Sequence, residues 1–473
     1  MKPAFPGPAR VLGLREAIML IVGIVIGAGI FKAPSMVAGM AGSTSWMFAA
    51  WVLGGVISLI GALCYAELAT AFPSAGGDYH FLRRAYGRPV AFLFAWARFS
   101  VITTGSIALL AFVFGDYLQQ AVPLDLPPGW GAGAYALAAI LVLWAVNARG
   151  IRAGASTQAW LTALEVCGLL LVFVAALWLA AGAGTGSAPE PVASPVASGA
   201  GPGVSAFGMA MVFVLLTYGG WNEAAYISAE IKDGRRNMVR ALVVSILAIT
   251  FLYLLVTWAY WYGLGLEGMA RSEALAADLL GKAFGATGKT VIAVLVAIAA
   301  LTSMNATMIV GARTNYAVGR DWPLLHRLGH WDGERGTPAN AMHLQNAAAA
   351  LLVLLGAWTG SGFASMVEFT APVFWLFFLL TGLALFLLRR RAPNVDRPYR
   401  VPLYPVLPVI FCATCGYMLW SSLTYVSSQS LGGMNAAWIG VAVLAVGGGL
   451  LLILRRTPGS MTTKQPTGTQ RIS

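Results

Sequence analysis

The chain has 473 residues, of which 58% are hydrophobic and only 10% are charged. A soluble domain carries about 25% charged residues, so this composition, with a mean hydropathy of +0.75, excludes an ordinary soluble protein and indicates a protein embedded in a lipid bilayer. The formal net charge of +12 would suit a nucleic-acid-binding protein. The basic residues, however, are concentrated in alternate loops between apolar segments, so we expect no nucleic-acid partner.

Twelve apolar segments are each long enough to cross a bilayer as a helix, which takes about 20 residues. In chain order they are 16–40, 44–71, 89–120, 131–147, 157–180, 204–231, 236–265, 285–318, 340–357, 364–388, 404–427 and 433–454. The sequence therefore predicts an all-α membrane protein with about twelve transmembrane helices.

The basic residues indicate which side of the membrane each loop faces. They gather before the first span and after each even-numbered span, for example in 83–88 and 389–400. Positive residues mark the cytoplasmic side. We therefore expect a multi-pass protein of the cell membrane, in particular the bacterial inner membrane, with both termini in the cytoplasm.

Paired glycines interrupt two of the apolar spans. Gly27 and Gly29 lie in the first span, and Gly219 and Gly220 lie in the sixth. Glycine is a poor helix former, and unpaired backbone at bilayer depth is tolerated only where protein buries it or where it lines a cavity. Two such breaks in corresponding halves of a chain indicate the binding site of a transporter.

The positions of the breaks also predict a division of the chain. The breaks lie in the first and sixth spans, which indicates a unit of five spans that is used twice. Because five is odd, the second copy would enter the membrane from the opposite side as an inverted repeat. We expect a first repeat with a cytoplasmic N-terminus, a flexible extracellular linker, a second repeat, two additional helices and a cytoplasmic tail, at 1–180, 181–203, 204–388, 389–456 and 457–473.

Several motifs in this order resemble the amino acid–polyamine–organocation transporter superfamily, near its L-type amino acid transporter branch. The resemblance covers residues 10–455 and is carried by Gly27-Ala28-Gly29-Ile30-Phe31, by Tyr218-Gly219-Gly220-Trp221-Asn222 with Glu230, by Tyr65-x-Glu67-Leu68 leading into Pro73-x-Ala75-Gly76-Gly77-x-Tyr79, and by Ser303-x-Asn305 with Arg313 and Val318-Gly319-Arg320-Asp321. The resemblance implies a transporter with broken first and sixth helices.

It also implies how the breaks would bind an amino acid. Backbone N–H groups of Gly27, Ala28 and Gly29 would hold the carboxylate, since half-helix N-termini attract anions. Carbonyl groups at the ends of the preceding half-helices would hold the ammonium, namely those of Ile24, Val25, Leu215, Leu216 and Thr217. Gly219 would allow a close approach of the substrate, and Asn222 resembles a substrate-side asparagine of the family.

Each of these residues also has a simpler interpretation. Glycine pairs can serve close helix packing, and an intramembrane asparagine such as Asn222 can hydrogen-bond a neighbouring helix. Leu216 stands where the L-type branch often has a phenylalanine gate, so Tyr218, Trp221 or an aromatic residue of the tenth span, such as Phe374 or Trp375, would have to close the site. Aromatic residues at helical spacing are also ordinary packing residues.

Glu165 lies in the middle of the fifth span, where a charge costs at least about 2.5 kcal/mol. The resemblance aligns it with a position at which many relatives carry a lysine. It could bind and release a proton and so couple transport to a proton gradient. Two alternatives remain open: a permanently protonated carboxyl hydrogen-bonded within the bundle, and a sodium ligand with Ser303 as co-ligand.

Five other charged residues are singled out by their depth in the spans. Lys32, just beyond the first break, could act at an outer vestibule by repelling cationic substrates, or it could pair with Glu368 or reach the interface. Glu67 and Glu230 lie close to clusters of cytoplasmic arginines and are expected to form ion pairs of an inner gate. Arg98 and Arg313 lie near cytoplasmic span ends and are expected to anchor them.

These features favour a secondary active amino acid transporter that works by alternating access, for neutral L-amino acids and with proton coupling. The alternatives are an amino acid exchanger and a permease for cationic amino acids or polyamines. An enzyme is not expected, since no paired acid–base motif lies within the spans. A channel would need a continuous pore and a receptor a ligand-binding ectodomain, whereas two midplane breaks in an inverted repeat favour alternating access. We expect no cofactor and no metal. We also expect no ancillary subunit, because heteromeric relatives attach theirs through an extracellular cysteine and no cysteine falls in an outer loop here.

Overall fold

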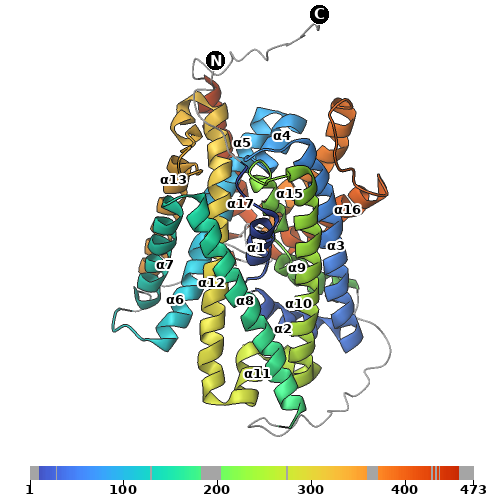
Figure 1. Cartoon of the computed structure of the whole chain (residues 1–473), viewed down its shortest axis with the longest axis vertical. Coiled ribbons are helices and arrows are strands. Elements are labelled where there is room, and N and C mark those ends of the chain that lie inside the picture. The colour runs from blue at the N-terminus through green and yellow to red at the C-terminus, as the bar shows by residue number, and fades with distance from the viewer. Residues whose placement is uncertain are drawn as a thin grey trace, which may run out of the picture.

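The computed structural model describes residues 10–27, 29–127, 130–182, 204–272, 275–359, 371–427, 430–431, 434–435 and 437–456. These residues are nearly all helical and form one upright bundle, as Figure 1 shows. The predicted all-α fold is confirmed. The proposed boundaries of the repeats stay a prediction, and most of the 181–203 linker and all of the 457–473 tail lie outside the described residues.

The helices follow one another along the chain with short connections. They are α1 Leu14–Val25, α2 Gly29–Ala41, α3 Thr44–Ala71, α4 Asp78–Tyr86, α5 Arg88–Ala97, the π-helix η1 Arg98–Thr103, α6 Thr104–Ala121, α7 Trp130–Ala148, α8 Ile151–Ala180, α9 Val204–Thr217, the 3₁₀ helix η2 Trp221–Ile227, α10 Gly234–Arg271, α11 Leu275–Phe284, α12 Ala286–Asp321, the 3₁₀ helix η3 Pro323–Gly329, α13 Ala339–Thr359, α15 Ala371–Arg391, α16 Val406–Ser427 and α17 Ala437–Arg456. Between α16 and α17, β1 (Ser430–Leu431) pairs with β2 (Met434–Asn435).

Nine helices among the described residues are long and apolar enough to cross a membrane: Thr44–Ala71, Arg88–Gln119, Trp130–Ala148, Ile151–Ala180, Arg236–Arg271, Ala286–Asp321, Ala339–Trp358, Pro372–Arg391 and Val406–Thr424. The remaining three predicted spans are the two broken ones, α1–α2 and α9–η2, and α17. Together they account for a fold with about twelve transmembrane helices.

The breaks occur where the glycines predict them. Helix α1 ends at Val25, its C-cap residue Ile26 is extended with φ −73° and ψ 107°, and α2 begins at Gly29. Helix α9 ends at Thr217, and Gly220 adopts φ +112° before η2 begins. A side chain is strained at that φ, so glycine at 220 is a requirement of the chain's path.

Two short helices differ from the sequence prediction. The turn-rich stretch around residue 77 leads into a nine-residue helix, α4, rather than a simple loop. Four of its buried residues, Asp78, Phe81, Leu82 and Ala85, have the i, i+3, i+4 and i+7 spacing of one helix face, and Tyr79 is buried beside them. Helix α11 was likewise not expected, because its ten residues are too few to read as a span.

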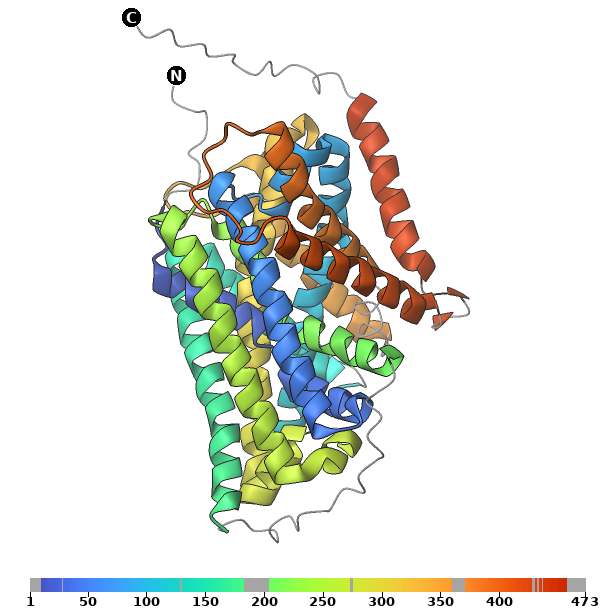
Figure 2. The ribbon, with the colours of Figure 1, turned by 90° about the vertical axis from the view of Figure 1, so that its right-hand side faces the viewer.

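The ends of the bundle differ in charge. One end carries α4, the start of α10 and the ends of α12 and α15, with Arg83, Arg236, Arg320 and Arg389 among its residues, and we call it the basic end. Helix α11 lies at the opposite end. Figure 2 shows α17 at the edge of the bundle, where Gly447 lies against the Trp96 ring of α5.

Candidate substrate site

The two helix breaks lie against each other. A Cβ atom built on Gly29 at the start of α2 would be 3.3 Å from Thr217 Cγ2 and 3.6 Å from its Cα, at the end of α9. A Cβ atom built on Gly220 would be 2.6 Å from Ile24 Cγ2 and 3.4 Å from its carbonyl oxygen. Each break therefore packs against the end of the other half-helix, and glycine is what allows the close approach.

A single hydroxyl group connects the carbonyl ends of both broken helices. Tyr253 of α10 is fully buried, and its Oη lies 2.9 Å from Val25 O and 3.0 Å from Thr217 O. A tyrosine hydroxyl has one proton to donate, so it can satisfy only one of the two carbonyls at a time. The other carbonyl is then without this donor.

The predicted backbone ligands fall at this junction, with two qualifications. Gly27 and Gly29 flank the first break and Gly219 lies in the second, while Ala28 is outside the described residues. The Leu216 carbonyl accepts a hydrogen bond from the Gly219 N–H at 3.1 Å and is therefore already engaged within the chain. Leu216 itself is 55% exposed. Ile24 and Leu215 lie in the last turns of α1 and α9, and their binding role stays a prediction.

The predicted side-chain residues of the second break are buried in packed surroundings. Asn222 is 2% exposed on η2. The Tyr218 hydroxyl donates to Trp51 O at 3.1 Å, and its ring contacts Trp51 and Tyr253. Trp221 packs edge-on against Tyr65. These contacts describe a tightly packed aromatic wall, and a gating role for Tyr218 and Trp221 stays a prediction.

A second set of aromatic side chains extends this wall towards the helices after the repeats. Trp221 also contacts the rings of Phe378 and Phe411, and Phe378 contacts Phe374 and Trp375. The tenth span thus reaches the second break through Phe378, one turn from the residues that the sequence suggested. The side chain of Lys32 and residue Glu368 lie outside what the structure describes.

Glu165 is buried within the bundle, at 2% exposure, on α8. It faces Thr302 of α12 and lies near Tyr253. Neither carboxyl oxygen has a hydrogen-bond partner among the described residues. A buried carboxyl group without a partner is costly, so this position needs a proton, an ion or a substrate group at some stage. The Tyr253 side chain places it close to the junction of the breaks.

Ser303 holds the end of the first half-helix. Its hydroxyl lies 3.3 Å from Gly23 O and 3.2 Å from Ile26 O, both at the carbonyl end of α1. Ser303 is on α12, so this side chain links the first break to a long helix of the bundle. The arrangement places the predicted coupling residues Glu165 and Ser303 on two helices that flank α1, and it does not decide between a proton and a sodium ion.

A buried chain of hydrogen-bonded polar side chains begins at Thr162, one turn from Glu165 on α8, and sequence reasoning missed it. Thr162 donates to Met19 O at 3.0 Å, and Gln158 donates to Thr162 at 3.2 Å. Asn305 donates to Gln158 at 2.8 Å, and Asn147 donates to Asn305 at 2.8 Å. The signal was present: Gln158, Thr162 and Glu165 recur at i, i+4 and i+7 within one apolar span.

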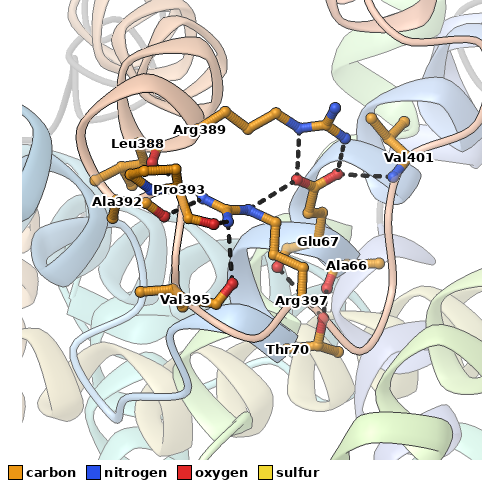
Figure 3. A network of polar contacts seen from close by, with 10 residues as sticks. All are labelled: Ala66, Glu67, Thr70, Leu388, Arg389, Ala392, Pro393, Val395, Arg397 and Val401. Atoms are coloured by element: carbon orange, nitrogen blue, oxygen red, sulfur yellow. Dashed lines mark hydrogen bonds and ion pairs between the residues drawn. The ribbon is translucent and has the colours of Figure 1, made fainter.

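Glu67 is the centre of an ion-pair network at the basic end, shown in Figure 3. Arg389 at the end of α15 donates to Glu67 Oε1 at 2.7 Å and to Oε2 at 2.6 Å. Arg397 lies 3.6 Å from Oε1, and the Val401 N–H donates to Oε2 at 2.7 Å. Glu67 thereby joins α3 to α15 and to the segment before α16. The predicted ion pairing of Glu67 is seen here.

Two further buried pairs lie at either end of η2. Arg313 of α12 binds Glu230 through Nε at 2.6 Å and Nη2 at 2.8 Å, and both side chains are 1% exposed. Arg98 at the start of η1 binds Glu223 through both terminal nitrogens, and Arg98 is 4% exposed. The prediction that Arg98 and Arg313 are surface anchors is therefore wrong. Each is buried and forms an ion pair with a carboxylate from a distant part of the sequence.

Comparisons with known proteins identify the family. The model of the amino acid permease family matches residues 12–444. The human b(0,+)-type amino acid transporter 1 is 30% identical over 400 residues, which cover 84% of this chain and 80% of the human protein. The serine/threonine exchanger SteT of Bacillus subtilis (strain 168) is 26% identical over 426 residues, covering 88% and 92%. The mouse large neutral amino acids transporter small subunit 2 is 29% identical over 422 residues, covering 87% and 76%. The chain therefore belongs to the amino acid permease family, in the amino acid–polyamine–organocation superfamily and near its L-type branch.

Proposed function

We propose that this permease moves neutral L-amino acids across a cell membrane by alternating access, and that it binds them at the junction of the two helix breaks. One observation carries the proposal: the carbonyl ends of α1 and α9 share a single hydroxyl donor, Tyr253, beside the N-terminal start of α2. The junction thus offers carbonyl oxygens and half-helix N–H groups side by side.

These groups complement the two charges that all amino acids share. The first N–H groups of a helix have no partner within it and carry partial positive charge, which suits a carboxylate. The last carbonyls carry partial negative charge, which suits an ammonium. In this proposal the start of α2 at Gly29 receives the carboxylate, and Val25 O or Thr217 O receives the ammonium.

Charges near the second break support a neutral side chain. Glu223 and Glu230, the acids of the segment that follows the break, are each bound by an arginine, so neither is free to receive a cationic side chain. The relatives include a serine/threonine exchanger and a large neutral amino acids transporter small subunit. A cationic amino acid or polyamine would have to use Glu165 instead.

We further propose that the basic end faces the cytoplasm, because positive residues mark that side, and that this end is closed in the structure. The N-terminal segment supports closure: Val11 and Leu12 donate their N–H groups to Glu230 O at 2.9 Å, and Lys232 donates to Leu12 O at 2.8 Å. Both termini would then lie in the cytoplasm. Since the four cysteines all lie in apolar spans, none is placed to attach an ancillary subunit outside the membrane.

Proton coupling through Glu165 is the proposed driving force, and exchange is the second candidate because one relative is a serine/threonine exchanger. Purified chain in proteoliposomes tests both. An inward proton gradient should drive accumulation of a neutral amino acid into vesicles that contain none. An obligatory exchanger would take up substrate only into preloaded vesicles. Uptake that collapses when sodium is replaced by choline at constant pH would contradict proton coupling and identify a sodium symporter.

A further inference from the structure

Three buried charged side chains from three different elements meet at the basic end, below the second break. Asp78 is the first residue of α4, Arg98 the first of η1, and Glu223 lies on η2. Asp78 is 3% exposed and Arg98 is 4% exposed, and the Glu223 side chain is 14% exposed. The cluster therefore contains two carboxyl groups and one guanidinium group, largely out of water.

The single arginine is committed to one of the two acids. Arg98 Nη1 donates to Glu223 Oε1 at 2.9 Å, Nη2 donates to Oε2, and the guanidinium carbon lies 4.2 Å from the centre of the Tyr226 ring. Asp78 has no ion pair among the described residues. Its Oδ2 accepts the Tyr226 hydroxyl at 3.0 Å, and its Oδ1 has no hydrogen-bond partner there.

A charge count then favours a proton on Asp78. If both acids were ionised, the cluster would hold an uncompensated negative charge, which is expensive in a buried site. The groups that face Asp78 are Tyr65 of α3, Arg98 of η1, and Glu223 and Tyr226 of η2. On the adjoining end of α12, the Asp321 carboxylate is bound by Tyr79 and Arg83 of α4.

Burial raises the pKa of Asp78 to about 6, against the lowering effects of Tyr65 and Arg98. Asp78 is on α4, outside the nine spanning helices. His80 on the same helix does not share this range, because burial, Arg84 and Arg83 lower its pKa to about 4.

The backbone holds α4 directly against η2. Gly77 has φ +46°, and a Cβ atom there would lie 2.6 Å from the Tyr226 ring. Ser74 N–H donates to the Ser228 hydroxyl at 3.1 Å. The start of α4 and η2 are thus docked around the same tyrosine that donates to Asp78, so a charge on Asp78 would act directly on the contact between α4 and η2.

We propose that Asp78 is a proton-binding site that controls closure of the basic end. Protonated Asp78 leaves Arg98 entirely to Glu223, and this pair holds η2 against η1. Ionised Asp78 competes for Arg98, weakens its bond to Glu223 and releases η2. This site is separate from Glu165. Only the exchange measurement below rests on the proposed function, because protonation of Asp78 can be measured without transport.

The first test compares thermal unfolding of the purified wild type and Asp78→Asn in detergent from pH 4 to pH 8. Because the folded-state pKa lies above the ordinary value of 3.8, the folded protein binds the proton more tightly than the unfolded chain does, and its stability falls as pH rises from about 4 through about 6. The wild type should lose several degrees over this range relative to Asp78→Asn. The control Asp125→Asn, at an exposed position, should follow the wild type.

The second test measures counterflow exchange in proteoliposomes with equal pH on both sides. The wild-type rate should rise about tenfold between pH 5 and pH 7, while Asp78→Asn should stay at the slow rate throughout. Tyr226→Phe removes a donor that favours the ionised carboxylate and should move the midpoint to higher pH, which keeps the test valid if Asp78→Asn folds poorly. Wild-type unfolding and exchange profiles in both variants would overturn the proposal. Absence of exchange by the wild type would contradict the proposed function and leave the unfolding test standing.

Discussion

The carbonyl oxygens of Val25 and Thr217, at the ends of two half-helices from different halves of the chain, lie within 3.0 Å of one hydroxyl group, that of Tyr253. Because one hydroxyl proton cannot serve both carbonyls at once, one of the two is always without this donor. In the proposed function, a substrate ammonium binds that carbonyl.

Removal of this hydroxyl should weaken substrate binding. Tyr253→Phe keeps the aromatic packing against Trp51 and Tyr218 and leaves both carbonyls without the donor. A hydrogen bond of this kind is worth about 0.5–1.5 kcal/mol, and without it the two half-helix ends are held less firmly in place, so we expect the KM for uptake to rise by up to about tenfold. Tyr262→Phe on the same helix, at a 37% exposed position, is the control. Equal KM values in wild type and Tyr253→Phe would refute a role for this hydroxyl in the site.

Side chains at the break glycines should abolish uptake while the protein still inserts. Gly29→Leu places atoms against Thr217, and Gly220→Ala is strained at φ +112° and meets Ile24 at 2.6 Å. The matched control is Gly416→Ala on α16, where a Cβ atom has no neighbour within 4 Å. Uptake is measured only for variants with normal yield and a monodisperse elution profile. Near-native uptake by Gly29→Leu or Gly220→Ala would remove that break from the site.

The buried pair of Arg313 and Glu230 should dominate the stability of the basic end. Arg313→Ala leaves a carboxylate with a 1% exposed side chain without its partner, which costs about 3–5 kcal/mol. Arg271→Ala removes an exposed partner of Glu267, with 78% and 62% exposed side chains, and should cost less than about 1 kcal/mol. Unfolding temperatures in detergent compare the two, and similar losses would show that the buried pair is not a principal support.

Glu165→Gln separates two interpretations of the buried carboxyl, a coupling proton and a permanently protonated group. The amide keeps the size and hydrogen-bonding capacity of a protonated carboxyl group but cannot release a proton. The variant should therefore retain substrate binding and counterflow exchange while it loses accumulation driven by a proton gradient. A permanently protonated Glu165 predicts unchanged pH dependence instead. If the variant still concentrates substrate on a proton gradient as the wild type does, Glu165 does not carry the coupling proton.

The fold and the breaks could be predicted because their signals are local. Apolar spans, basic loops and the glycines at 27, 29, 219 and 220 all mark structure at their own position in the chain. Helix α4 was missed because the turn residues before it masked the short amphipathic pattern that begins at Asp78.

The polar connections of the site could not be predicted, because each depends on a partner far away in the sequence. Arg98 resembles an interfacial anchor until the fold brings Glu223 to it. Tyr253 is one of many aromatic residues in an apolar span, and only packing reveals that its hydroxyl reaches both half-helices. The type of charge and its position along a span could be predicted from sequence, whereas its burial and its partner require the tertiary structure.

The central claim is that backbone groups at the two breaks recognise both charges of an amino acid. Competition for uptake of a labelled neutral amino acid tests it most directly, with three competitors that share one side chain: the amino acid, the amine that lacks the carboxylate, and the acid that lacks the ammonium. The account predicts that only the zwitterion competes at concentrations near its KM, since each single-charge analogue leaves one set of half-helix ends unpaired. Equal competition by the amine or by the acid would contradict it.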